Sequence, residues 1–265
     1  MDNVTLTTTK TKGESTKSNS IRMTLNGLLQ EGARAWNISQ TSLLLLCAVP
    51  FIIAFTGFAT ALIGKDAYKW FTGEDRFAEN LQVLFWGVAF VLNLLVVKYK
   101  YHEGDKIIAS LYLILSVGIF FLIGEELSWG QRIFGWVTPD SMRIINKQEE
   151  TNIHTIYGVD TMFKWMHLII GAYGTFLPLL VMRSKSLKKY QAPLSMLVPH
   201  YTLIPFFFIP FIWRIYRNFF TAPAKYYFAI AEYAEVIELI LSIAFVFFMV
   251  FQLRRIKMRK ILQKQ

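Results

Sequence analysis

The residues of this 265-residue chain best suited to chemistry lie between Gly124 and His154. This segment reads GEELSWGQRIFGWVTPDSMRIINKQEETNIH and follows directly on an apolar run, Ile107–Ile123. The adjacent carboxylates of Glu125 and Glu126 are costly at the end of such a run unless something pairs with them or binds them. Because polar groups at membrane depth usually serve a function, this stretch predicts a site.

Arg132 is the cation nearest to these two carboxylates in the sequence, and we expect it to pair with one of them. If the helix continues to about Phe134, Ser128 and Arg132 share one face at a four-residue spacing. Glu125 and Glu126 then point about 100° apart, so that one faces the bundle and the other the membrane interface.

A second polar group follows Thr138-Pro139-Asp140, which predicts a turn or a helix start. Its members are Asn146, Gln148, Glu149, Glu150, Asn152 and His154. If this segment is helical, Glu150 and His154 share a face. An ordinary solvated loop outside the cytoplasm is the alternative interpretation.

A third polar group lies in the last apolar segment, where Glu232, Glu235 and Glu238 recur every three residues. This spacing predicts a stripe on one side of a helix, with Glu238 deep in the hydrocarbon. Three carboxylates there repel one another unless they are protonated, paired or bound to a metal. The nearby cations that offer ion pairs are Arg214, Arg217, Lys225 and Arg132.

Carboxylates with one or two histidines are ligand types that suit zinc or iron. The candidate metal ligands are Glu126, His154 and Glu235, although the chain has no HExxH pattern. Acid–base chemistry without a metal uses the same side chains. The candidate catalytic residues are Glu125, Glu126, Arg132, Glu150, His154 and Glu235.

The composition, 54% hydrophobic and 16% aromatic, is too apolar for an average soluble domain. A spanning helix needs about 20 mostly apolar residues, and six segments qualify. They predict an all-α, polytopic bundle with spans at Ser42–Gly64, Asn80–Val97, Ile107–Leu127, Thr161–Met182, Leu194–Trp213 and Tyr227–Leu253. The fifth is the least regular, because Pro199, Pro205 and Pro210 interrupt its backbone hydrogen bonds.

The basic residues predict the orientation of these spans. If the spans alternate from a cytoplasmic N-terminus, 18 of the 28 Lys and Arg residues fall on the cytoplasmic side. The positive-inside rule favours this arrangement, with both termini in the cytoplasm of a cell (inner or plasma) membrane. Most of the acidic residues then lie on the opposite side, together with the polar groups above.

Outside the spans, residues 1–20 are rich in Thr, Ser and Lys and predict a disordered tail. Residues 21–41 are compatible with a short interfacial helix, with an ordinary polar lead-in as the alternative. The basic tail, 254–265, is expected to contact anionic lipids at the cytoplasmic face. No sequence pattern of a nucleic-acid-binding module is present.

The strings GEELSWGQRIFGW and NKQEETNIH resemble a group of uncharacterised bacterial multi-pass membrane proteins that carry an EE-x-SWGQR…N-x-Q-x-E-x-N-x-H motif. The matching region covers about thirty residues, and the resemblance implies membership without a known activity. A looser likeness, in topology and polar chemistry, is to alkaline ceramidase-like membrane hydrolases, whose set of several membrane histidines this chain lacks.

The sequence is compatible with three classes of function. The joint clustering of carboxylates, amides and His154 favours a membrane enzyme acting on a lipid or lipid-linked substrate from the outer leaflet. Buried glutamates beside a proline-broken helix also fit a proton- or cation-coupled transporter. A non-catalytic scaffold or sensor, in which the polar core fixes the packing, is the third.

Overall fold

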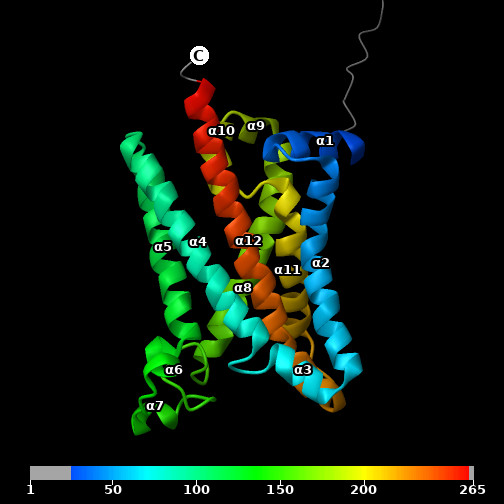
Figure 1. Ribbon diagram of the computed structural model, residues 1–265, viewed down its shortest axis with the longest axis vertical. Coiled ribbons are helices and arrows are strands. Elements are labelled where there is room, and N and C mark those ends of the chain that lie inside the picture. The colour runs from blue at the N-terminus through cyan, green and yellow to red at the C-terminus, as the bar shows by residue number, and fades with distance from the viewer. Residues whose placement is uncertain (1–24, 263–265) are drawn as a thin grey trace, which may run out of the picture.

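The computed structural model describes residues 25–262, which form an all-α bundle (Figure 1). Six helical segments are long and apolar enough to cross a membrane, and they overlap all six predicted spans. The prediction of a multi-pass, all-α membrane protein is therefore confirmed. The spanning elements are α2 (Gln40–Ile63), α4 (Phe77–His102), α5 (Lys106–Glu126), α8 (Val159–Arg183), α10 with α11 (Gln191–Leu197 and Ile204–Phe219) and α12 (Tyr227–Leu262).

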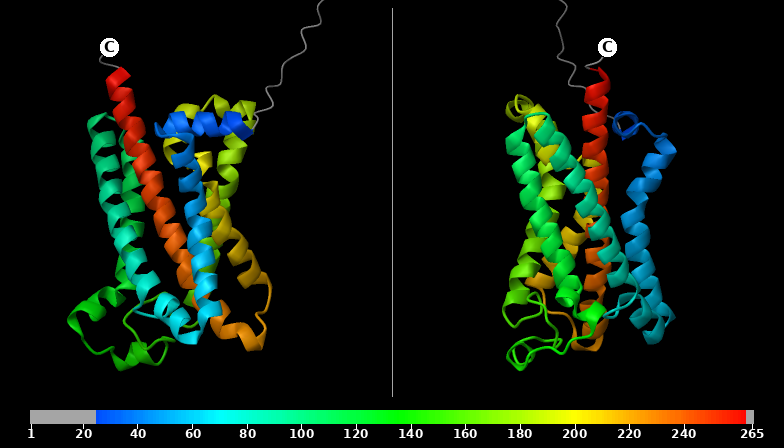
Figure 2. Two further views of the ribbon diagram at one scale, coloured as in Figure 1. Left: turned by 45° about the vertical axis from the view of Figure 1, so that its right-hand side comes forward. Right: turned by 60° about the vertical axis from the view of Figure 1, so that its left-hand side comes forward.

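Helix α12 lies in the middle of the bundle and is the most buried of the six segments. Helices α4 and α5 pack together on one side of it, and α8 packs on α11 on another (Figures 1 and 2). Helix α2 lies along α11 and α12. The buried face of α12 carries large apolar side chains from Val236 to Ile256, so the hydrophobic core follows this helix.

Small residues set the close approach of α8 to α11. A side chain at Gly174 would overlap the ring of Phe207, and a Cβ at Gly171 would lie 2.9 Å from the Phe211 Cα. Glycines allow such contact between the backbones of membrane helices, where packing rather than water drives association. This contact places Arg214 of α11 beside His167 of α8.

The fifth segment is broken where its prolines predict irregularity. Helix α10 ends at Leu197, Pro199 lies in an extended connection, and a 3-10 turn at Tyr201–Leu203 leads into α11. Pro205 stands in the first turn of α11, where its missing N–H costs little. Pro210 lies inside α11. The segment predicted as one span, Leu194–Trp213, is thus two helices in tandem.

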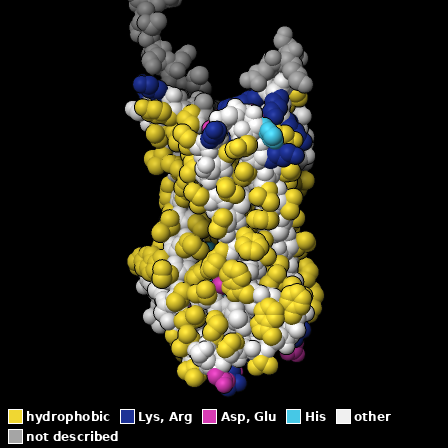
Figure 3. Space-filling model, turned by 90° about the vertical axis from the view of Figure 1, so that its left-hand side faces the viewer, with side chains coloured by type: hydrophobic (Ala, Val, Ile, Leu, Met, Phe, Trp, Pro, Cys, Tyr) yellow, Lys and Arg dark blue, Asp and Glu magenta, His cyan; other side chains and the backbone are white. Residues whose placement is uncertain are grey.

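The two ends of the bundle differ in chemistry. The basic end carries α1 (Leu25–Trp36), α9 (Lys185–Lys188) and the last turns of α12, so the described chain begins and ends there (Figure 1). Figure 3 shows Lys and Arg gathered at this end, above a broad hydrophobic band. The polar end carries α3 (Lys65–Thr72), α6 (Gln131–Phe134) and α7 (Asp140–Arg143).

Helix α1 lies across the bundle at the basic end, within the region predicted to be interfacial (Figures 1 and 2). Its place in the membrane interface stays a prediction, as does the cytoplasmic location of the basic end. The disordered tail predicted for residues 1–20 lies outside the described residues.

Candidate functional site

Helix α5 ends at Glu126 in a tight left-handed turn. Ser128, Trp129 and Gly130 have φ angles of 46°, 52° and 98°, which are uncommon for residues other than glycine. The condition under which Ser128 and Arg132 would share a helix face, a helix continuing to Phe134, is therefore not met, because this turn separates α5 from the short helix α6. Such backbone strain persists only where the surrounding structure fixes it.

The turn is held by the side chains that it presents. Trp129 Nε1 donates to Glu125 at 2.6 Å, and its ring packs so closely over Gly124 that a Cβ there would lie 2.9 Å away. Ser128 Oγ donates to Glu150 at 2.5 Å. The SWG sequence thus fixes the end of α5 and, with it, the two adjacent carboxylates.

Glu125 is almost completely buried, and four hydrogen bonds hold its carboxylate. Besides Trp129, it accepts from the backbone N–H of Ile153 at 2.7 Å and from that of His154 at 2.6 Å. The fourth partner is His154 Nδ1, at 3.2 Å. Glu125 therefore links the end of α5 to the distant loop that carries the histidine.

His154 is oriented by this contact. If Nδ1 donates to the Glu125 carboxylate, the other ring nitrogen is the acceptor, and it makes no hydrogen bond to any described residue. Burial lowers the pKa of His154, whereas the bond to Glu125 and the charges of Glu126 and Glu238 raise it. The net direction is upward from the ordinary value. An imidazole of this kind exchanges protons near neutral pH.

The segment before His154 is a loop, so the helical alternative, in which Glu150 and His154 would share a face, does not apply. Asn146 replaces helical hydrogen bonds with its side chain, which donates to both oxygens of Asn152 at 2.9 Å and accepts from the Gln148 N–H at 2.8 Å. Asn152 in turn donates to Glu150 at 2.8 Å. These bonds give the loop a fixed shape that delivers His154 to Glu125.

The amide of Gln131 ties the same loop to α6. Its oxygen accepts from the Thr151 N–H at 2.7 Å, and its nitrogen donates to Thr138 at 2.8 Å. Two groups of residues within the motif noted in the sequence thus have different roles. Ser128, Gln131, Asn146 and Asn152 shape the backbone, whereas Glu125, Glu126 and His154 line a cavity.

Glu126 points toward α4, where Gln82 Nε2 donates to its carboxylate at 2.6 Å. Gln82 is fully buried, and none of the site residues predicted from the sequence lies on its helix. Its sequence signal is an amide inside a largely apolar span that also contains Asn93, and a buried amide is costly unless it is paired.

Arg132 does not pair with the side chain of Glu125 or Glu126. It forms ion pairs with Glu79, at 2.6 Å, and Asp75, and donates to the backbone oxygen of Glu126 at 2.7 Å. The expected carboxylate partners are therefore replaced by acids that precede and begin α4. Arg132 joins α6 to α4 across 53 residues of sequence.

The glutamates of α12 have different surroundings. Glu238 forms an ion pair with Arg214 at 2.7 Å, and Arg214 also donates to His167 at 2.9 Å. Arg214 was among the cations expected to pair with this stripe. Glu235 forms no hydrogen bond or ion pair with any residue from 25 to 262.

A cavity of about 310 Å³ lies between α5, α8, α11 and α12 at the polar end, and Glu125, Glu126, His154 and Glu235 all line it. A smaller cavity of about 30 Å³ adjoins these four side chains and adds Glu150. Five of the six candidate catalytic residues thus meet at one place, and Arg132 supports it from α6. His167, Arg214 and Glu238 complete the wall of the larger cavity.

Within the described part of the chain, no three His, Cys, Asp or Glu side chains are grouped so that they could hold a metal ion. The ligand set Glu126, His154 and Glu235 therefore stays a prediction.

Comparisons with protein-family models, with curated proteins and with solved structures find no match for this chain. The resemblance to the motif-bearing membrane proteins stays a prediction as well. The chemistry open to this site follows from the cavity, which combines an oriented imidazole, several carboxyl groups and the guanidinium of Arg214.

Proposed function

We propose that the chain is a membrane enzyme that performs acid–base chemistry on a lipid or lipid-linked substrate. The observation that carries this proposal is the pairing of His154 Nδ1 with the buried Glu125 at the wall of the 310 Å³ cavity. A carboxylate that fixes one imidazole nitrogen leaves the other to take a proton from a water or hydroxyl group.

Glu126 and Glu235 supply the complementary role. Both line the cavity with His154, and neither is paired with a cation among the described residues. A carboxyl group in this position can return a proton to a leaving group. The proposal needs no metal, although its metal-assisted form would use Glu126, His154 and Glu235.

The chemistry of the wall supports an amphipathic substrate. Leu122 and Phe163 line the cavity alongside the charged groups, and Arg217 offers positive charge for a phosphate or carboxylate, whereas Lys147 is already paired with Asp160. Pockets that join apolar walls to a few placed polar groups are typical of small-molecule sites. The resemblance to the motif-bearing membrane proteins implies no activity, so the substrate class rests on this lining.

Lipid turnover by the purified protein tests the proposal. Wild type, His154→Ala and a matched control, His102→Ala, are placed in nanodiscs made from a total lipid extract of the expression host, and the lipids are followed by mass spectrometry. Wild type and the control should convert at least one lipid species. His154→Ala should convert it at least about 100-fold more slowly. Equal conversion by His154→Ala, or no conversion by wild type, contradicts the proposal.

One observation favours the transporter alternative: Glu235 lies unpaired in an acid-rich cavity. Proton flux into proteoliposomes, measured with a pH-sensitive dye, separates the two functions. Flux that Glu235→Gln abolishes, in a protein that converts no lipid, establishes the transporter. If His154→Ala and Glu235→Gln lower thermal stability and change neither lipid conversion nor proton flux, the polar core only fixes the packing of a scaffold protein.

A further inference from the structure

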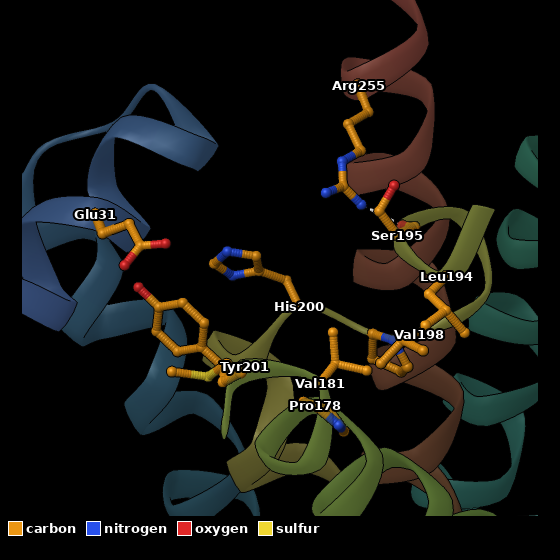
Figure 4. Close-up of a pocket in the computed structure, with 11 residues that line it drawn as sticks. Glu31, Pro178, Val181, Leu194, Ser195, Val198, His200, Tyr201 and Arg255 are labelled. Carbon is orange, nitrogen blue, oxygen red and sulfur yellow. Dashed lines mark hydrogen bonds between the residues drawn. The ribbon is translucent and has the colours of Figure 1, made fainter. Parts of the chain in front are cut away.

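A second cavity, of about 140 Å³, lies at the basic end where the fifth segment is broken. The extended connection Val198–His200 and the last turn of α10 form one wall, and α8, α1 and α12 close the others (Figure 4). Non-helical backbone at membrane depth is tolerated where it is buried in protein or lines a cavity. This cavity therefore accounts for the break, and it is separate from the cavity at the polar end.

Two opposite charges face this cavity from different helices. Glu31 projects from α1 and Arg255 from α12, and Figure 4 shows them on opposite sides with the His200 ring between them. Neither forms an ion pair with the other or with any other side chain in residues 25–262. The cavity thus holds a carboxylate and a guanidinium that are held apart.

The protein itself occupies only part of the Arg255 guanidinium. One nitrogen donates to the Ser195 carbonyl, and the guanidinium carbon lies 5.4 Å from the Phe251 ring centroid. A planar guanidinium with unused donors is well suited to a phosphate group. Because Arg255 belongs to the basic C-terminal part of α12, an incoming phosphate also meets a favourable field.

The side chains between the two charges are rigidly placed. His200 stacks between Tyr201 and Phe251, with ring centroids 4.3 Å and 4.6 Å away. The Tyr201 hydroxyl donates to the Leu28 carbonyl at 2.6 Å and points toward Glu31 (Figure 4). Because the Tyr201 hydroxyl is held by Leu28, the group that offers a negative charge on that side of the cavity is Glu31.

The remaining wall is apolar. Pro178 and Val181 of α8, with Leu194 and Val198 of the broken segment, face the cavity. Such a wall suits the glycerol and upper acyl carbons of a lipid better than a free, fully hydrated ion.

We propose that this cavity binds the headgroup of a zwitterionic phospholipid that carries a primary amine, with its phosphate at Arg255 and its ammonium at Glu31. A headgroup that ends in glycerol offers Glu31 hydroxyl groups but no cation. A quaternary ammonium lacks the N–H donors that a carboxylate accepts. This inference does not rest on the proposed enzymatic function.

Native mass spectrometry of the delipidated full-length protein tests the inference. Phosphatidylethanolamine, phosphatidylglycerol and phosphatidylcholine are titrated separately, and free phosphoethanolamine is added to distinguish a lipid site from a site for the soluble headgroup. Wild type should bind phosphatidylethanolamine about three- to fivefold more tightly than the other two lipids, as expected for one partly exposed ion pair. Binding of phosphoethanolamine alone with equal affinity would contradict a lipid site.

Two variants assign the ends of the headgroup. Glu31→Gln should remove the preference for the ethanolamine lipid over the glycerol lipid, and this variant is expected to fold because Glu31 makes no hydrogen bond or ion pair among the described residues. Arg255→Lys should weaken the binding of both lipids. Lys257→Gln, a matched control on the exposed side of α12, should change neither. An unchanged preference in Glu31→Gln, or tighter binding of phosphatidylglycerol by wild type, overturns the inference.

Discussion

At the scale of single residues, Glu125 organises the polar end of the molecule. Its carboxylate satisfies two backbone N–H groups, the indole of Trp129 and the imidazole of His154. A buried donor that loses its partner costs about 1–3 kcal/mol. Glu125 therefore fixes the loop and the histidine together, and a change at this residue affects both.

The raised pKa of His154 predicts a stability contribution that depends on pH. Because the pKa in the folded state lies above its ordinary value, the contribution is full below the ordinary pKa and is lost as the pH rises through the raised one. The thermal midpoint of wild type should exceed that of His154→Gln most in mildly acidic buffer, with the difference shrinking toward alkaline buffer. Thermal unfolding of both proteins in detergent, across the neutral range, measures this difference.

A difference between the two midpoints that grows with pH would contradict this linkage. Ser141→Ala provides the control, because Ser141 is exposed in the same connection between spans. The midpoint of Ser141→Ala should follow that of wild type at every pH.

At the scale of elements, the connection between α5 and α8 owes its shape to side chains rather than to regular secondary structure. Asn152 alone bonds to Asn146, Glu150 and Thr155. The loop thus behaves as one hydrogen-bonded unit docked on the end of α5.

Asn152→Ala should loosen this unit, because Asn146, Glu150 and Thr155 each lose a hydrogen bond, and two of these residues are buried. We expect a loss of about 1–3 kcal/mol in the free energy of unfolding and faster amide exchange across residues 146–158. Hydrogen–deuterium exchange with mass spectrometry measures the second effect directly. Exchange in 146–158 as slow as in wild type would show that the Asn152 bonds do not hold the loop.

The sequence predicts the spans and the grouping of the polar residues, but not all of their partners. The spans were predictable, because length and apolar content alone decide whether a helix can cross a bilayer. The convergence of Glu125, Glu126, His154 and Glu235 followed from placing their segments in one half of the bundle. The partners of Arg132 did not follow, because its ion pairs with Asp75 and Glu79 depend on the left-handed turn at Ser128 and Trp129.

At the scale of the whole molecule, the central helix α12 separates two polar regions of different character. Its N-terminal half presents Glu235 and Glu238 to the cavity at the polar end, and its C-terminal half presents Arg255 to the cavity at the basic end. The buried apolar side chains between them, from Leu239 to Leu253, belong to the hydrophobic core. One helix therefore positions residues in both cavities.

The distribution of basic residues predicts that the polar end faces away from the cytoplasm. In a variant with Cys47→Ser, the single native cysteine, new cysteines replace either Val137 at the polar end or Met258 at the basic end, which are 82% and 46% exposed. A membrane-impermeant maleimide should label Val137→Cys in intact cells and Met258→Cys only after lysis. The reverse pattern would invert the topology and place the cavity at the polar end in the cytoplasmic half.

If Glu125 holds His154 as a proton-exchanging group at the cavity, then the pKa of His154 must depend on Glu125. Nuclear magnetic resonance of histidine-labelled protein in nanodiscs, with the His154 signal assigned through His154→Gln, follows the protonation of His154 with pH. We predict that the pKa of His154 lies above its ordinary value and falls in Glu125→Gln. A His154 pKa at or below the ordinary value in wild type, or one unchanged in Glu125→Gln, would contradict the account.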